Sequence, residues 1–150
     1  MNFGWVWKSI AAGLCGTLAH TLLMLFKAQS GILPGFNPYA GLQQSLSQLT
    51  GSEVHPAVPW LLSLLNGAML LGPLFGSLYR VLPGDSAITK DIVFGIAGWL
   101  AMCAIFFPVI GIGFFATNTG LGIWPAAFTL AMLLTYSIIM AAAYARLRNV

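Results

Sequence analysis

Charged residues are scarce along this chain: of its 150 residues only 6% are Asp, Glu, Lys or Arg. Soluble domains carry about a quarter charged residues. Hydrophobic residues make up 59% of the sequence, so too little polar material is present to cover a surface in water. The composition excludes a soluble globular domain and predicts a protein whose solvent is lipid.

The few charges form none of the clusters that bind nucleic acid or perform catalysis. No basic cluster interleaved with aromatic residues is present to bind phosphates. The three acids, Glu53, Asp85 and Asp91, lie in predicted loops or at the ends of apolar runs, and Asp85 and Asp91 are expected in a solvated turn with Arg80 and Lys90. No carboxylate pair, HExxH, GxSxG or phosphate-binding loop occurs. We expect neither enzymatic activity nor a nucleic-acid partner.

Cysteine is nearly absent, which excludes a disulfide framework and a cysteine metal site. Cys15 and Cys103 lie within apolar runs and fit no CxxC or other metal-binding spacing, so both are expected to be free thiols. No metal and no cofactor is predicted. The first apolar run is too long for the hydrophobic region of a signal peptide and lacks an A-x-A cleavage site. We therefore expect it to remain as a membrane span.

Long apolar runs are what the sequence has in abundance. Four of them approach or exceed the roughly 20 residues that cross a bilayer, at residues 6–26, 57–81, 92–115 and 124–147. Backbone groups in hydrocarbon must be hydrogen-bonded internally, and the alternation typical of barrel strands is absent, so each run is predicted to be a helix. The predicted fold is an all-α membrane protein, a single four-helix domain over residues 1–150.

The positions of the cations predict the orientation of the chain. Lys27 lies on one side of the predicted membrane. The other side carries the remaining five cations, Lys8, Arg80, Lys90, Arg146 and Arg148. Loops rich in Lys and Arg stay in the cytoplasm. The pattern therefore predicts a multi-pass protein of the bacterial inner membrane with both termini cytoplasmic.

The long loop between the first two spans contains a predicted amphipathic helix. Asn37 and Pro38 are typical of a helix start, and Gly51 is a plausible end. Apolar residues recur between them at helical spacing, at Leu42, Leu46 and Leu49. We expect a short helix on the outer membrane face. A lid packed over the bundle is the favoured interpretation, and a ligand-binding loop is the alternative.

The two predicted helical hairpins resemble each other. At one constant offset Lys8, Gly13 and Gly16 match Lys90, Gly95 and Gly98, and at another Pro56, Gly72 and Gly76 match Pro125, Ala141 and Ala145. Such a parallel repeat has its axis along the membrane normal. Because small residues allow helices to pack closely, we predict that Gly13 and Gly16 face Gly95 and Gly98. The pairs Gly72 with Gly76 and Ala141 with Ala145 are predicted to form a second set of helix contacts.

His20 is the one histidine inside a predicted span. At helical spacing it shares a face with Gly13, Gly16 and Thr17, so it is predicted to point into the bundle. Asn66 lies at a similar depth on the second span, and we predict a hydrogen bond between these two side chains. Haem ligation together with Met102, the residue that matches His20 in the repeat, and a proton relay are the functional alternatives.

Several short motifs carry a resemblance to a known family. They are the LPG at residues 82–84, the KDIVFGIAGWL at 90–100, Pro108 followed by GIGFF, and Tyr144 near the end of the last span. On these motifs the chain resembles a family of small four-span bacterial inner-membrane proteins of unknown function. The resemblance implies a four-span fold and supplies no activity. It also implies histidines in spans two and four, where this chain has Ser63 and Leu133.

These features predict a non-catalytic membrane protein, an accessory or assembly subunit of a larger membrane complex. Its expected partners are the lipid bilayer and other membrane proteins, in a hetero-complex or a homo-oligomer. A small oligomeric channel or transporter is the alternative, because repeat interfaces can hold transport sites. A haem- or quinone-binding subunit is a further alternative, based on His20 and the aromatic residues.

Overall fold

The computed structural model describes residues 4–148, and every regular element among them is helical. The elements in chain order are α1 Gly4–Ser30, α2 Pro38–Thr50, α3 Ala57–Leu65, the π-helix η1 Asn66–Leu71, α4 Gly72–Leu78, α5 Ala87–Ala101, the π-helix η2 Met102–Phe106, α6 Phe107–Val109, the 3-10 helix η3 Phe114–Thr119 and α7 Trp124–Arg148. The predicted all-α class is confirmed.

Four helical stretches in the described part are long and apolar enough to cross a membrane: Gly4–Ser30, Ala57–Leu78, Ile88–Val109 and Trp124–Leu147. The predicted number of spans is confirmed, but the third was predicted to continue to residue 115. It ends earlier because Gly111 and Gly113 adopt positive φ angles of 80° and 83°, a conformation that glycine adopts readily and that ends a helix.

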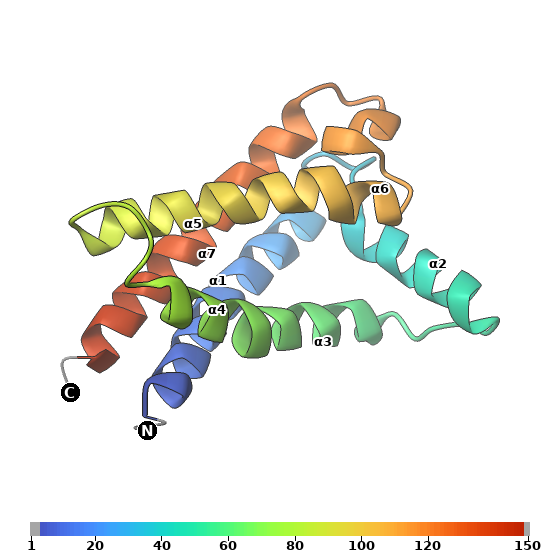
Figure 1. Ribbon diagram of the computed structural model, residues 1–150. Coiled ribbons are helices and arrows are strands. Elements are labelled where there is room, and N and C mark those ends of the chain that lie inside the picture. Colours follow the sequence, from blue (N-terminus) through green and yellow to red (C-terminus); the bar gives the residue numbers. More distant parts are fainter. Residues whose placement is uncertain (1–3, 149–150) are drawn as a thin grey trace.

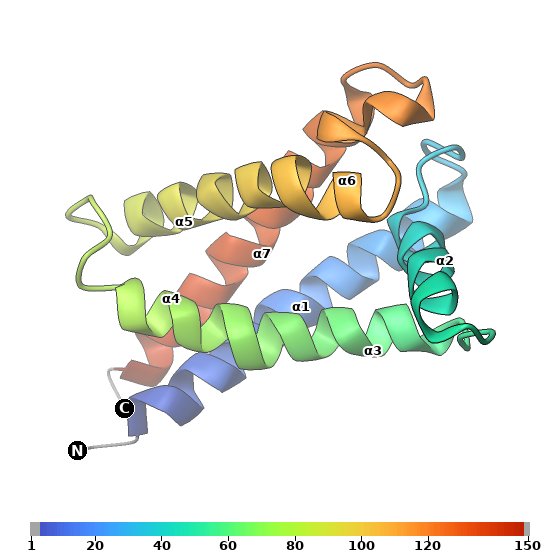
Figure 2. The same ribbon diagram turned by 45° about the vertical axis from the view of Figure 1, so that its right-hand side comes forward.

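Two long helices, α1 and α7, form the centre of the structure (Figures 1 and 2). They pack extensively against each other, α5 packs on α7, and the rod formed by α3, η1 and α4 packs on α1. Both ends of the chain lie at one end of the bundle, together with the loop between α4 and α5. The helices α2 and η3 lie at the opposite end.

Prolines shape the second and third spans. Pro73 and Pro108 each follow a π-helix, η1 and η2, in which the backbone N–H bonds five residues back, Gly72 to Gly67 and Phe107 to Met102. Proline cannot donate, and its ring clashes with the carbonyl four residues earlier. The wider π turn separates the proline ring from that carbonyl. Each of the two prolines is therefore preceded by a π-helix.

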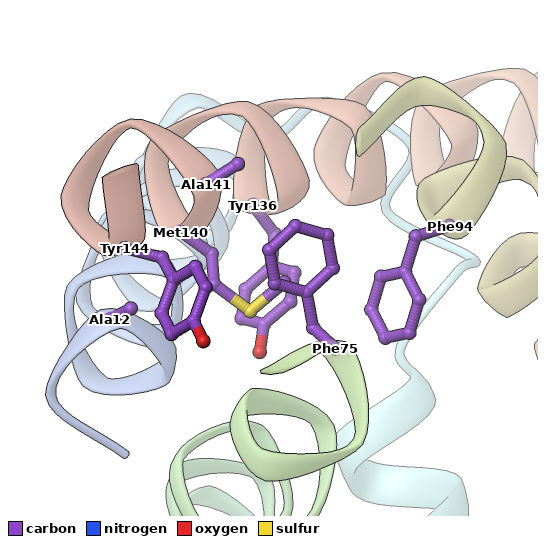
Figure 3. Packing of buried hydrophobic residues seen from close by; sticks show 7 residues of the cluster. All are labelled: Ala12, Phe75, Phe94, Tyr136, Met140, Ala141 and Tyr144. Carbon is purple, nitrogen blue, oxygen red and sulfur yellow. The ribbon is translucent and has the colours of Figure 1, made fainter. Parts of the chain in front are cut away.

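Aromatic side chains fill the core near the chain termini (Figure 3). The ring of Phe75 packs edge-on against Phe94 at 5.2 Å and Tyr144 at 5.9 Å between centroids, a favourable geometry for aromatic pairs. A second cluster lies nearer the opposite end and contains Phe36, Cys103, Phe107, Ile110, Ala116 and Ala126. Neither Cys15 nor Cys103 forms a disulfide.

The predicted amphipathic helix is present as α2. Gly51 follows its last residue with a φ of 67°, as expected for a glycine that ends a helix. The start differs from the prediction, because the Asn37 side chain does not cap the helix. Its Nδ2 instead donates to the Pro34 carbonyl at 2.8 Å. The first turn of α2 therefore keeps backbone N–H groups without a capping side chain.

The sequence predicted that the glycines of the first span face those of the third. The structure shows a different arrangement. A Cβ built on Gly13 would meet the Gly67 carbonyl oxygen at 2.5 Å, so Gly13 faces the second span. Gly16 faces the ring of Tyr136 on α7, and Gly98 has open space around it. The reason is that α7, rather than α5, lies against α1. The two-hairpin repeat itself stays a prediction.

The other small residues lie at helix contacts. Gly72 approaches the backbone of Ser9, and Gly76 approaches its side chain. Gly95 lies against Ser137 of α7. Of the alanine pair, Ala141 is buried in the aromatic core and Ala145 is half-buried. Close approach of α1 to α4 therefore depends on glycines, as is common in membrane helices.

We predict that Gly13→Ala destabilises the protein, because the new methyl group meets backbone atoms of the second span that have no room to move. Overpacking of this kind costs about 1–3 kcal/mol, and thermal unfolding in detergent would measure it. Gly98→Ala is the matched control: nothing lies within 4 Å of its new Cβ, and alanine favours helix by about 1 kcal/mol. Equal stability of the two variants would contradict the packing described.

Candidate functional site

Buried and half-buried polar side chains lie on both central helices, α1 and α7. Ser9 and Thr17 of α1 are buried, as are Thr129, Tyr136 and Ser137 of α7, and His20 of α1 is half-buried. Polar groups at membrane depth turn away from lipid. Ser9 and Thr17 lie against Gly76 and Gly67 of the second span. On α7, Tyr136 lies against Gly16 of α1 and Ser137 against Gly95 of α5. We call this set, Ser9, Thr17, His20, Thr129, Tyr136 and Ser137, the polar seam.

The hydroxyl groups of the seam mostly bond to their own helix. Ser9 donates to the Trp5 carbonyl and Thr17 to the Gly13 carbonyl, each at 2.8 Å. Thr129 donates to the carbonyl of Pro125 at 3.0 Å. Ser and Thr commonly bond backbone one turn back when they lie inside a helix. These three hydroxyls are therefore occupied.

Tyr136 makes a hydrogen bond that crosses between helices. Its hydroxyl donates to the Gly67 carbonyl at 2.9 Å, and the bond is buried. Figure 3 shows the Tyr136 oxygen directed away from α7 toward the second span. The Gly67 carbonyl also accepts the N–H of Gly72 within η1, so both acceptor sites of this oxygen are used. Gly16 provides the space for the Tyr136 ring.

The predicted hydrogen bond between His20 and Asn66 is not present among residues 4–148. His20 is half-buried and has no hydrogen-bond partner in this part of the chain, and Asn66 is exposed. The reason lies in the helix geometry. Gly67 faces Thr17 of α1, and successive residues of a helix point about 100° apart. Asn66 therefore points to the side of the contact with α1, where it is exposed.

Asp91 is buried, which contradicts the solvated turn that its sequence position indicated. The residue is 2% exposed, and its Oδ1 has no hydrogen-bond partner in the described structure. Ser137 has an unpaired, buried Oγ as well. Lys90 does not pair with Asp91, because its Nζ donates to the Tyr79 carbonyl at 2.7 Å. The missed signal is the helical spacing between Asp91 and Gly95, which packs on Ser137.

The described residues contain no group of three or more His, Cys, Asp or Glu side chains that could hold a metal ion. His20 was the weak candidate ligand, with Met102 as its proposed mate in haem binding. Met102 packs against the second core cluster, around Phe107. Chemically, the seam offers one occupied phenol, one histidine without a partner in the described structure and the unpaired hydroxyl of Ser137. The unpaired acid, Asp91, lies outside the seam, on α5.

We predict that Tyr136→Phe weakens the fold by removing the hydrogen bond to Gly67. Interhelical bonds in membranes contribute about 0.6 kcal/mol on average and up to about 1.7, so a loss within this range is expected in reversible unfolding in detergent. Tyr144→Phe is the control, because the Tyr144 hydroxyl has no hydrogen bond within residues 4–148. An equal loss in both variants would argue against the Tyr136 bond as the cause.

The comparisons with known proteins give a family and no activity. Residues 4–150 match the model of a family of unknown function, DUF6789. No curated protein and no solved structure matches the chain. The match covers nearly the whole sequence and agrees with the resemblance to a family of unknown function. The chain therefore belongs to DUF6789, a family of unknown function.

Proposed function

We propose that this protein is a non-catalytic accessory or assembly subunit that binds laterally to a larger membrane protein in the inner membrane of a bacterium. One observation carries the proposal. The side chain of Asn66 is exposed in the middle of a membrane span, and within residues 4–148 it has no hydrogen-bond partner.

The position of Asn66 makes this exposure costly. The second span begins at Ala57, so at 1.5 Å per residue Asn66 lies about 14 Å from that end. A carboxamide has two donors and an acceptor, and each group left without a partner in hydrocarbon costs several kcal/mol. Lipid tails offer neither donors nor acceptors. A polar group of another membrane helix would satisfy the amide.

The surroundings of Asn66 favour a different protein over a second copy. The exposed neighbours on this span are large and apolar: Leu62, Leu65, Met69 and Leu70. Close self-association of membrane helices uses small residues that let the backbones approach. A second copy would present the same bulky face. A partner with small residues and one polar group would fit it better.

The distribution of cations supports the proposed orientation in the membrane. Lys8 and Arg146 lie near the two chain termini, and Arg80 and Lys90 flank the loop at the same end of the bundle. Lys27 is near the opposite end, and the Arg148 side chain lies outside the described part. By the positive-inside rule, this distribution supports an orientation with both termini in the cytoplasm.

A second candidate function, a small transporter or channel, is favoured by Asp91. Ionisable residues within membrane spans commonly mark ion or proton pathways. Asp91 lies in the first turns of the third span, it is buried, and its Oδ1 is unpaired. Ser137, with its own unpaired oxygen, lies against Gly95, one turn further along α5. In this candidate function the Asp91 carboxyl binds and releases the transported proton.

For the accessory role, we predict that Asn66→Leu loses the partner. The protein would be extracted from its own host in mild detergent and examined by native mass spectrometry. Wild-type protein is expected to appear together with larger subunits in a fixed ratio. Asn66→Leu is expected to recover about three- to tenfold less of these subunits, as for the loss of one interhelical hydrogen bond. Ser77→Ala is the control, because the exposed Ser77 hydroxyl already bonds the Leu74 carbonyl.

Two outcomes would contradict the accessory role. If wild-type protein is found only as monomers or homo-oligomers, it has no bound partner subunit. Equal recovery of the larger subunits with wild type and Asn66→Leu would leave the complex in place but show that the Asn66 amide does not hold it.

For the transport candidate, we predict that Asp91→Asn abolishes proton flux. Purified protein would be reconstituted in vesicles containing a pH-sensitive dye, and a membrane potential would be imposed. Asp85→Asn is the matched control, because Asp85 is exposed in the neighbouring loop. Absence of flux in wild-type vesicles, or equal flux in both variants, would reject this candidate.

A further inference from the structure

A small cavity lies at the end of the bundle opposite the chain termini, between α1, the start of α2 and α3. Its volume is about 130 Å³. Met24 and Lys27 of α1, Tyr39 of α2 and Trp60 of α3 contribute to its lining. It is separate from the polar seam and from the exposed face around Asn66.

Lys27 brings a buried positive charge to this cavity. The residue is only 4% exposed, and its Nζ donates to the Phe36 carbonyl at 2.6 Å and lies 5.6 Å from the Phe36 ring centroid. An ammonium group has three donors, and this one has no anionic partner among the described residues. A buried charge is costly unless it is paired. Two donors and the whole charge remain to be satisfied.

The N-terminus of α2 brings a second positive feature to the same cavity. Asn37, Pro38, Tyr39 and Ala40, the cap and first turn of this 13-residue helix, line the cavity. The first N–H groups of a helix have no partner within it, and no side chain caps this end. Proline has no N–H, so Tyr39 and Ala40 supply the free donors.

These two positive features lie next to each other, because Phe36, which binds the Lys27 ammonium, comes directly before Asn37. A helix N-terminus carries about half a positive charge and repels a nearby cation. An anion bound between them would attract both positive features and accept hydrogen bonds from the free N–H groups. We propose that this cavity binds the phosphate group of a ligand through the Lys27 ammonium and the N-terminus of α2.

The walls of the cavity carry no competing anion. The Tyr39 hydroxyl donates to Ser63 Oγ at 3.0 Å, and its ring lies 4.3 Å from that of Trp60. Burial raises the pKa of Tyr39 above its ordinary value of 10.0, an effect that the hydrogen bond with Ser63 partly offsets. The phenol therefore stays neutral at physiological pH. The Lys27 charge is left for an external anion.

The place of the cavity indicates a phosphate rather than a smaller anion. A tetrahedral oxyanion has enough acceptors for two ammonium donors and two backbone donors at once. The cavity lies near the end of α1, where Tyr39 and Trp60 are typical of the membrane–water interface. Phospholipid headgroups are found at this level. The remaining apolar lining, Met24, Ala28, Pro38 and Ala40, suits the rest of a lipid. Free phosphate would present the same chemistry.

The test uses purified, detergent-solubilised protein with two probes. Native mass spectrometry measures the retention of added phosphatidylglycerol, and thermal unfolding measures stabilisation by inorganic phosphate. Lys27→Gln is expected to reduce binding about tenfold or more, as for the loss of a charged hydrogen bond. Lys90→Gln is the matched control. Lys90 also bonds a backbone carbonyl and lies over an aromatic ring, that of Tyr79, at the opposite end of the bundle.

Two further variants keep the test valid where Lys27→Gln lowers stability. Lys27→Arg retains the charge and is expected to retain binding. Ala28→Phe fills the cavity from an exposed rim position and is expected to lose binding with the charge in place. If Lys27→Gln reduces the retention of phosphatidylglycerol, the ligand is a lipid headgroup. If it reduces the stabilisation by inorganic phosphate, the ligand is free phosphate. Binding equal in wild type, Lys27→Gln and Ala28→Phe, or no binding by folded wild type, overturns the proposal.

Discussion

The carbonyl of Gly67 is the point at which three membrane spans are joined. Pro73 prevents regular α-helical bonding in the second span, and the resulting π turn places the Gly72 N–H on this carbonyl. The Tyr136 hydroxyl of α7 bonds the same oxygen. The backbone of α1 passes close beside it at Gly13. A proline, a tyrosine and a glycine, far apart in the sequence, therefore converge on one backbone atom.

The sequence predicts this region only in part, because periodicity identifies the face of a helix and not the neighbour of that face. The inward direction of Gly13 and Gly16 follows from helical spacing, and both are buried. Their partners depend on which helix lies alongside. The internal similarity of the hairpins pointed to Gly95 and Gly98, whereas the bulky ring of Tyr136 determines the contact with Gly16. The composition of isolated spans carries no information about that choice.

Charged residues at the ends of spans were the least predictable feature. Asp91 and Lys27 both lie where a sequence places a solvated boundary, yet each is almost fully buried. For Asp91, the cause is that α5 begins at Ala87 and packs on α7. For Lys27, the cause is the turn before α2, which brings Phe36 over the end of α1. The amphipathic helix itself was predictable, but the position of the chain leading into it was not.

The polar groups of this protein thus divide into two sets with different consequences. Most hydroxyls of the seam bond backbone within the chain, so they stabilise the fold and need nothing from outside. Three other residues keep polar atoms or charge without a partner in the described structure: Asn66, Asp91 and Lys27. Each of them lies at a different depth. In a chain with 6% charged residues, every polar group left without a partner in the membrane is a cost to stability. Function is therefore to be sought where the chain leaves such groups unsatisfied, at its lateral face and at its two ends, rather than in its closed centre.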